Sequence, residues 1–207
     1  MKQKERQERS RQEILLAAMA EFGTHNYEDV TMEGICTAHG ISKGMMYHYY
    51  ANKDAVFLVC VEEVFRRLRA YIEMQAAVLA PLEPLERIRN YFVIRESYFQ
   101  QHPIERNIFE NAQFRPPRHL VDEIQARRQP LRAMNLHFLQ QIIWQLPLRP
   151  CVDHAEALRY LESIEEVYWR MLAQYRPSGE AMDLHTQTAL AERLLDLLLF
   201  GALRQTR

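Results

Sequence analysis

The sequence predicts an all-α protein. Apolar residues recur at spacings of three and four along most of the 207 residues, which is the period of one face of a helix. Only 6 residues are glycine and 9 are proline, too few for the many turns of an all-β protein. The apolar content of 48% is enough to bury a sizeable core. We therefore expect nine or ten helices.

The first expected helix covers residues 5–22. Gly23 follows it, and glycine is common just past the carboxyl end of a helix. The first twelve residues carry a local charge of +3 and contain no long apolar run, so they do not resemble a secretory signal. We expect this basic arm to be frayed.

Two short helices are expected next, separated by a glycine turn. Thr31 is a good N-cap for the first, which ends at His39, and Ser42 is a good N-cap for the second, over residues 43–50. Two short helices joined by such a turn are typical of a DNA-binding helix-turn-helix, whose second helix enters the major groove. The side chains expected to face inward and fix the angle between the helices are Ile35, Ala38, Ile41, Met46 and Tyr50.

The residues left facing outward on the second short helix suit a phosphate backbone. Ser42 offers a hydroxyl beside a helix N-terminus, where amide donors and the helix dipole favour an anion. Tyr47, His48 and Tyr49 each place a donor at the end of a rigid ring. Lys53 adds a positive charge at the start of the next helix. The alternative is that this ring-rich surface has no ligand.

Base recognition is expected from the first residues of the same helix. Lys43 can donate to guanine O6 and N7. Gly44 lets the backbone approach base edges, and Met45 can contact a thymine methyl group. On the preceding helix, Met32 or Glu33 is expected near a neighbouring base.

This stretch resembles the DNA-binding domain of the TetR family of bacterial transcriptional regulators. The resemblance covers about a quarter of the chain, residues 10–60. The family usually has alanine where this chain has Cys36 and His39, and phenylalanine where it has Tyr50. The matching residues are Ile14, Leu15, Ala17, Ala18, Phe22, Gly23, Thr31, Ile35, Ala38, Gly40, Ile41, Ser42, Lys43, Gly44, Tyr47, Tyr49, Tyr50, Lys53 and Asp54.

The resemblance also implies roles for individual residues and for the two parts of the chain. Residues 1–52 are expected to form the DNA-binding domain, and residues 53–207 a larger helical domain for effector binding and dimerisation. Base contacts are implied for Lys43, Gly44 and Met45. The residues implied at phosphates are Thr31, Ser42, Tyr47, His48, Tyr49 and Lys53.

The net charge conceals a local pattern that fits this interpretation. The 26 basic and 27 acidic residues give a formal charge of −1. Residues 1–12 carry +3 and residues 39–53 carry +2, whereas residues 13–38 carry −5. The positive charges therefore lie in the arm and at the expected recognition helix.

Longer helices bounded by prolines and caps are expected in the second domain. Asn52 and Asp153 are good N-caps, and Pro130 is expected to kink or split its helix because it lacks an interior donor. The expected helices cover residues 53–80, 85–101, 104–114, 119–146, 154–176 and 183–205.

Arg95 interrupts an apolar segment of this domain, residues 91–99, in a helix expected to be central. A buried charge must be paired or meet a ligand. One hypothesis places Arg95 in the polar part of a pocket for a small-molecule effector of unknown identity, with Asn107, Glu110 or Gln113 from the next helix. The alternative is an internal pair between Arg95 and a carboxylate.

The last two helices carry apolar stripes that suit a homodimer interface of four helices. The alternative is that the stripes pack within their own subunit. The residues expected at the interface are Leu161, Ile164, Tyr168, Met171, Leu190, Leu194, Leu197 and Gly201.

Other chemistry finds no support in the sequence. The eight histidines show no helical zinc pattern, and there is no glycine-rich phosphate loop or nucleophile elbow, so we expect no metal, no cofactor and no enzyme activity. The most apolar run, residues 194–203, contains Asp196 and is shorter than the ~20 residues of a membrane span. Three cysteines without short spacing fit a reducing cytoplasm.

These observations predict a cytoplasmic, homodimeric transcriptional regulator. We expect a repressor that leaves a palindromic, double-stranded DNA operator when a small-molecule effector binds. One alternative is a DNA-binding protein of the same fold controlled by a protein partner. A second is an all-helical enzyme or interaction protein with a vestigial DNA motif, against which the intact Lys43, Tyr47 and Lys53 count.

Overall fold

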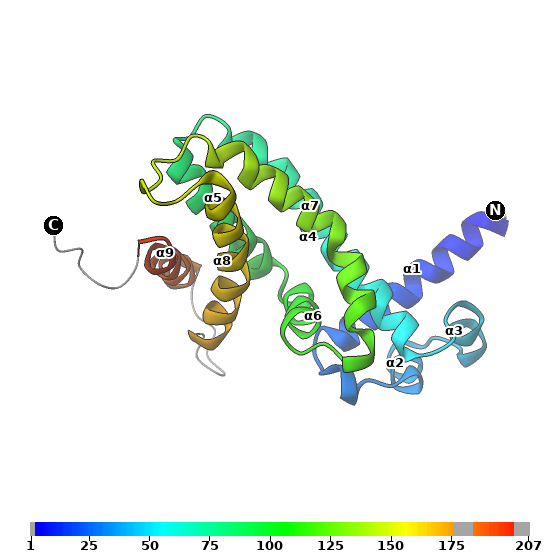
Figure 1. Cartoon of the computed structure of the whole chain (residues 1–207). Coiled ribbons are helices and arrows are strands. Elements are labelled where there is room, and N and C mark those ends of the chain that lie inside the picture. Colours follow the sequence, from blue (N-terminus) through cyan, green and yellow to red (C-terminus); the bar gives the residue numbers. More distant parts are fainter. Residues whose placement is uncertain (1–2, 176–183, 201–207) are drawn as a thin grey trace. The chain divides into compact units, whose positions relative to one another are not determined.

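The computed structural model describes residues 3–175 and 184–200, and these residues form helices and connecting loops without a strand (Figure 1). The expected all-α class is therefore confirmed. The elements in the described residues are α1 (Gln3–Phe22), η1 (Tyr27–Asp29), α2 (Met32–His39), α3 (Lys43–Tyr49), α4 (Lys53–Leu79), α5 (Pro84–Gln101), α6 (Pro103–Phe114), η2 (Arg118–Leu120), α7 (Val121–Ile143), α8 (His154–Tyr175) and α9 (Leu184–Phe200), where η marks a 3₁₀ turn.

Most helix bounds lie within a few residues of those expected, and two expectations need correction. The basic arm is helical from Gln3, so it is an ordered part of α1 rather than frayed. Helix α7 starts at Val121 and continues past Pro130 without a break, so the expected split is wrong, whereas a kink at Pro130 stays a prediction. The side chain next to this proline, Leu131, is buried in the core, which favours keeping the helix intact despite the missing backbone donor.

The chain divides into two compact units. Unit 1 contains residues 1–67 and 102–131, and unit 2 contains residues 68–101 and 132–207. Helices α4 and α7 each contribute to both units. These units are defined by compactness, whereas the expected boundary near residue 52 separates DNA binding from effector binding and dimerisation. That functional boundary stays a prediction.

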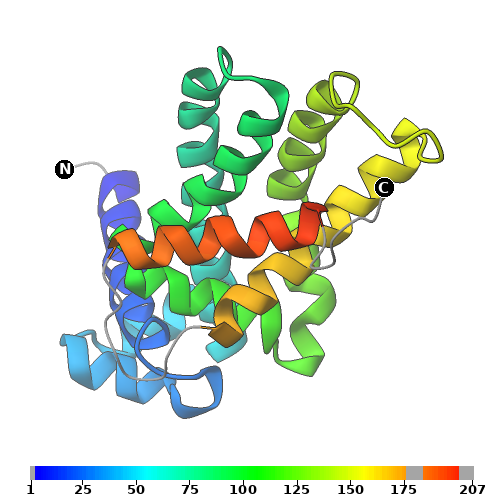
Figure 2. The same ribbon diagram turned by 90° about the vertical axis from the view of Figure 1, so that its left-hand side faces the viewer.

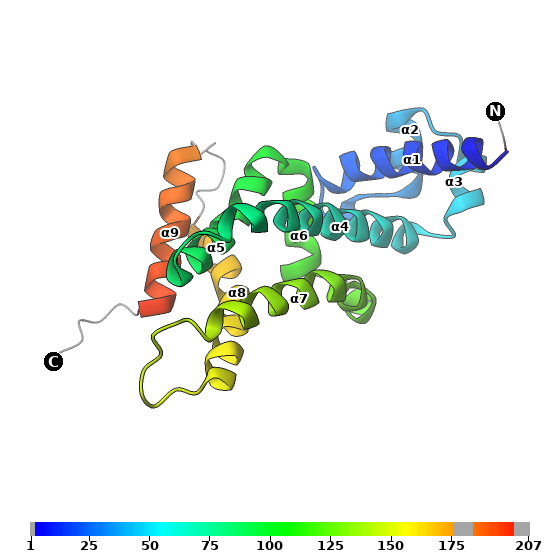
Figure 3. The same ribbon diagram turned by 90° about the horizontal axis from the view of Figure 1, so that it is seen from above.

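Unit 1 is built around α1, which contacts α2, α3 and α6. Figure 3 shows α1, α2 and α3 gathered beside the amino-terminal part of α4. The rings of Phe22 and Tyr27 each lie 5.0 Å from the ring of Phe57, which anchors the start of α4 to the end of α1. Arg67 Nη1 donates to Glu105 Oε1 over 2.8 Å and joins α4 to α6.

Gly23 is required by packing rather than by backbone conformation. Its φ is not positive, unlike that of Gly40, which adopts φ +67°. A Cβ at Gly23 would lie 2.3 Å from Ile104 Cγ2 and 2.7 Å from the Met19 carbonyl oxygen. The first residues of α6 therefore approach the end of α1 too closely for a side chain there.

Unit 2 contains a core of aromatic rings from α5, α7 and α8. Tyr91 stacks on Phe138 with 4.2 Å between centroids, and Phe92 meets Tyr168 edge to face at 5.2 Å. Helix α9 contacts α5 and α8 and crosses them in Figure 2. No helix in the described residues is long and apolar enough to cross a membrane.

Candidate nucleic-acid interface

The helix-turn-helix is assembled by the caps that the sequence predicts. The Thr31 hydroxyl accepts from the Gly34 amide over 2.9 Å and begins α2. Gly40 ends α2 in the left-handed region, where glycine is favoured. The Ser42 hydroxyl accepts from the Met45 amide over 3.1 Å and begins α3. These short-range bonds determine where each helix of the motif begins.

The inner face of the motif differs slightly from the expected set. Ile35, Ile41 and Met46 are buried, as predicted, and Tyr50 is half-buried. Ala38 is exposed, so its assignment to the inner face is wrong. Met32 fills the core in its place with 7% of its surface exposed, which removes it as a candidate for base contact.

The outer face of α3 presents four of the predicted DNA-contacting residues to solvent, whereas Met45 is half-buried. Tyr47 is 51% exposed, and Lys43, Gly44 and His48 are exposed as well. A Cβ at Gly44 would meet no atom within 4 Å, so packing within the chain does not require a glycine there. An open glycine on this face allows the backbone to approach another molecule closely.

Tyr49 is half-buried and its ring is positioned by two neighbours. The His48 ring meets it edge to face at 4.9 Å, and the Arg11 guanidinium lies 5.6 Å from its centroid. The contact with Arg11 places a cation from α1 beside α3. The helical arm thus adds to the positive charge near the recognition helix.

Lys43 is paired with Glu33 on the surface. Lys43 Nζ donates to Glu33 Oε1, and both side chains are largely exposed. This hydrogen bond lowers the pKa of Glu33 and raises the pKa of Lys43. The sequence suggested a role for each residue separately, but their pairing depends on the angle between α2 and α3.

Lys53 is engaged by the 3₁₀ turn η1 rather than extended into solvent. Its Nζ donates to the Tyr27 carbonyl oxygen over 2.8 Å and lies 4.2 Å from the centroid of the Tyr27 ring. A phosphate contact by Lys53 therefore requires this side chain to leave or share these partners. Its role at DNA stays a prediction.

Asp54 connects three segments of unit 1. Tyr27 Oη donates to Asp54 Oδ1, and His119 Nε2 lies 3.1 Å from Asp54 Oδ2. The hydrogen bond from Tyr27 lowers the pKa of Asp54, and His119 adds to this effect. Burial, followed by the bond to Asp54, raises the pKa of Tyr27. Nothing in the local sequence signalled this cluster, because its members lie far apart in the chain.

Arg95 is the centre of a buried polar network in unit 2. Its Nη1 donates to Glu165 Oε1 over 2.5 Å, and its Nη2 donates to Tyr91 Oη over 2.8 Å. Tyr91 Oη donates in turn to Asn135 Oδ1, and Asn135 Nδ2 donates to Glu165 Oε1 over 3.0 Å. Burial alone lowers the pKa of Arg95, but Glu165 and Tyr91 outweigh it and raise the pKa.

This network corresponds to the second of the two alternatives for Arg95, an internal pair with a carboxylate. The residues expected beside it belong to α6 in unit 1, where Asn107 Nδ2 donates to the Phe22 carbonyl oxygen over 3.5 Å. Glu110 and Gln113 are half-buried on the same helix. Glu165, the carboxylate that partners Arg95, lies 70 residues away and was not identified from the sequence.

The expected dimer residues divide into buried and exposed groups. Four of them pack within unit 2, Met171 and Leu190 are half-buried, and Gly201 lies outside the described residues. Leu197 is exposed, together with Tyr160, Val167 and Phe200, which were not in the expected set. The four buried residues are Leu161, Ile164, Tyr168 and Leu194.

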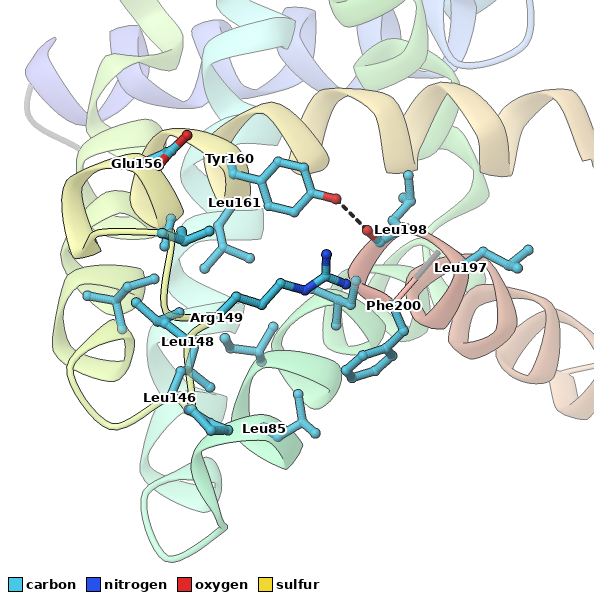
Figure 4. Close-up of a pocket in the computed structure, with 16 residues that line it drawn as sticks. Leu85, Leu146, Leu148, Arg149, Glu156, Tyr160, Leu161, Leu197, Leu198 and Phe200 are labelled. Atoms are coloured by element: carbon cyan, nitrogen blue, oxygen red, sulfur yellow. Dashed lines mark hydrogen bonds between the residues drawn. The ribbon is translucent and has the colours of Figure 1, made fainter. Parts of the chain in front are cut away.

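Unit 2 also has a cleft of about 820 Å³ between the ends of α7 and α9 and the start of α8 (Figure 4). Its walls are mainly leucine, isoleucine and proline side chains. The Arg149 side chain extends across the cleft toward Phe200, and Tyr160 Oη donates to the Leu198 carbonyl oxygen over 2.6 Å. A volume of this size is in the range that holds small organic ligands.

Residues 14–60 match the model of a family described as bacterial regulatory proteins, tetR family. Over 200 aligned residues the chain is 25% identical to the HTH-type transcriptional repressor KstR2 of Mycobacterium tuberculosis, and the alignment covers 94% of this chain and 94% of KstR2.

Within the described residues, no group of three or more histidine, cysteine or acidic side chains is placed to hold a metal ion.

Solved structures of similar fold include three regulators. The ketosteroid transcriptional regulator KstR2 of M. tuberculosis has a TM-score of 0.57 at 24% identity, covering 94% of this chain and 95% of its own. FadR of Bacillus subtilis, in complex with stearoyl-CoA, has a TM-score of 0.64 at 17% sequence identity, and the match covers 92% of this chain and 98% of FadR. FadR of Thermus thermophilus, in complex with lauroyl-CoA, has a TM-score of 0.60 at 22% sequence identity, and the match covers 95% of this chain and 97% of that FadR.

Proposed function

Because the chain is a TetR-family helix-turn-helix protein, we propose that it is a transcriptional repressor whose α3 enters the major groove of a palindromic operator. The observation that carries this proposal is the outer face of α3. Its first two residues, Lys43 and Gly44, are exposed, its N-terminus is capped by Ser42, and the Tyr47 and His48 side chains are exposed. An exposed polar helix end of this kind matches the groove and the phosphates that border it.

The proposed contacts separate into positioning and recognition. Phosphate contacts by serine, threonine and ring side chains set the orientation of the protein on the duplex and carry no sequence information. Base contacts are assigned to Lys43, Gly44 and Met45 at the start of α3. The residues assigned to phosphates are Thr31, Ser42, Tyr47, His48, Tyr49 and Lys53.

A homodimer is the proposed form on DNA, because two recognition helices of a symmetric dimer match the two halves of a palindrome. Exposed apolar side chains on α8 and α9 support this proposal. Tyr160 and Val167 lie on α8, and Leu197 and Phe200 lie on α9. Light scattering at micromolar concentration tests it, and a monomer would contradict it.

A small molecule with an apolar chain is the proposed effector. The cleft of about 820 Å³ in unit 2 is large enough for such a ligand, and its leucine-rich walls suit an apolar chain. The FadR structures named above contain stearoyl-CoA and lauroyl-CoA, which makes fatty acyl thioesters the first probes to use. An effector that prefers the form unable to bind DNA lowers operator affinity by linkage between the two sites.

Selection of bound duplexes from random DNA tests the proposed function. The full chain should enrich a palindromic sequence, and lauroyl-CoA or stearoyl-CoA should lower the affinity for that sequence. Enrichment without any response to acyl thioesters would favour another effector or control by a protein partner. Failure to enrich any sequence would contradict DNA binding itself.

A further inference from the structure

Glu33 is the one side chain of the first three residues of α2 that faces solvent. Met32 before it is buried, and Gly34 after it has no side chain. Glu33 is joined to Lys43, the first residue of α3, and the two side chains are 66% and 60% exposed. A carboxylate and an ammonium group therefore lie together at the amino-terminal ends of both helices of the motif.

We propose that Glu33 and Lys43 together recognise one G·C base pair in the major groove. Lys43 donates to guanine O6 and N7, and Glu33 accepts from the amino group at cytosine N4. This proposal rests on the proposed DNA-binding function and assigns to Glu33 a role in specificity.

The position of the pair is suited to this task. In helix-turn-helix complexes the amino-terminal residues of the second helix contact base edges, and Lys43 occupies the first position of α3. The hydrogen bond from Lys43 Nζ holds the Glu33 carboxylate beside the ammonium group. Wherever Lys43 meets a base edge, Glu33 is available for a neighbouring group.

The chemistry of the pair matches a G·C edge and opposes the others. Guanine offers acceptors at O6 and N7, and the cytosine opposite offers a donor at N4 directly beside O6. A donor next to an acceptor on the protein complements this order. A T opposite an A would place the O4 acceptor near the Glu33 carboxylate, and the repulsion would disfavour that pair.

The charges of the pair also explain why an acidic residue is tolerated at a DNA surface. A lone carboxylate near phosphates would weaken binding to every sequence. Beside Lys43 the two charges cancel, so the pair adds little to non-specific attraction while it adds a donor and an acceptor for base recognition. Removing Glu33 should therefore strengthen non-specific binding and weaken discrimination at the same time.

Selection from random DNA with wild type, Glu33→Ala and Glu33→Gln tests this proposal. The motif selected by wild type should contain an invariant G·C pair. At this pair the preference for G·C over the other base pairs should fall roughly 5- to 100-fold in Glu33→Ala, which is the range of one good base contact. Glu33→Gln should lose part of the cytosine preference, because the amide oxygen still accepts but the amide nitrogen also donates. Affinity of both variants for scrambled duplex should rise.

Glu13→Ala is the matched control, since Glu13 is an exposed acid on α1 in the same unit. It removes the same charge, and its motif should equal that of wild type. If Glu33→Ala keeps the wild-type preference at every position, the proposal is wrong although the protein binds DNA. If wild type enriches no motif, the proposed function fails as well, and the two failures are thereby distinguished.

Discussion

Arg95 Nη1 donates to Glu165 Oε1 across 2.5 Å in the interior of unit 2, where the arginine is 1% exposed. Replacing Arg95 with alanine removes the guanidinium that donates to Glu165 while the carboxylate stays buried. We expect this change to lower the free energy of unfolding by about 3–5 kcal/mol, the usual cost of breaking a buried pair. Urea unfolding followed by circular dichroism at fixed protein concentration measures it.

The double variant Arg95→Met, Glu165→Leu is the control for this prediction. Both charges are absent, so it should lose less stability than the two single changes added together. Wild-type stability of Arg95→Ala would contradict the importance of the pair. A loss of effector response by a folded Arg95 variant would instead support the pocket hypothesis for this residue.

Ser42 has two assigned roles that a pair of substitutions can separate. Aspartate is as good an N-cap as serine, so Ser42→Asp should keep the stability of α3 while its negative charge repels a phosphate. Ser42→Ala should lose the cap, which lowers the free energy of unfolding by about 1 kcal/mol. It should nevertheless bind DNA more tightly than Ser42→Asp, because it adds no negative charge. Unfolding and gel-shift measurements on both variants provide the comparison. Strong DNA binding by Ser42→Asp would place the phosphate elsewhere.

Tyr47 and Lys43 should differ in what their replacement does to DNA binding. Tyr47→Phe removes one exposed hydroxyl, and we expect a loss of about fivefold in affinity for all sequences alike. Lys43→Ala should also relax base preference, because its donors are assigned to guanine. Fluorescence anisotropy with the selected duplex and with single-base variants distinguishes the two. An unchanged base preference in Lys43→Ala would show that the base assignment is wrong.

Asp54 should make the stability of unit 1 sensitive to acid. Its pKa is lowered by the hydrogen bond from Tyr27, so its contribution is present above the unfolded pKa of about 4 and is lost as pH falls through the lower folded value. Asp54→Asn should therefore be about 1–2 kcal/mol less stable than wild type at neutral pH. This difference should shrink as the solution is acidified.

Unfolding experiments across this pH range test the prediction, with Asp122→Asn as the control. Asp122 is an exposed acid on the first turn of α7. The same measurement on this variant gives the effect of removing an exposed acid from unit 1. A constant difference between wild type and Asp54→Asn at all pH values would contradict a role for the charged carboxylate.

The helix-turn-helix could be predicted almost completely because its determinants are local. Thr31, Gly40 and Ser42 act within three or four residues of their own positions, and the structure has each of them in the expected role. Asn52 and Asp153 behave in the same way, accepting from amides three residues later. Caps of this kind depend on neighbouring backbone groups and can be identified from the sequence alone.

The contacts that were missed join residues distant in the sequence. Ile104 leaves no space for a side chain at Gly23, and Arg95 is paired with Glu165. The periodicity of apolar residues does not specify which helices meet or at which residues they touch. The pair of Glu33 and Lys43 depends on the angle between two helices rather than on either helix alone. The local pattern therefore predicts helices and their ends, while the partners of charged side chains depend on tertiary packing.

The salt dependence of binding to a selected duplex is the most direct test of DNA recognition by the exposed face of α3. If the assigned residues neutralise phosphates, affinity should fall by at least about 10³-fold between about 50 and 200 mM salt, since bound counterions are released. Affinity for a scrambled duplex should be weaker at every salt concentration. Equal affinity for both duplexes, or an affinity that salt does not change, would contradict recognition of DNA by this surface.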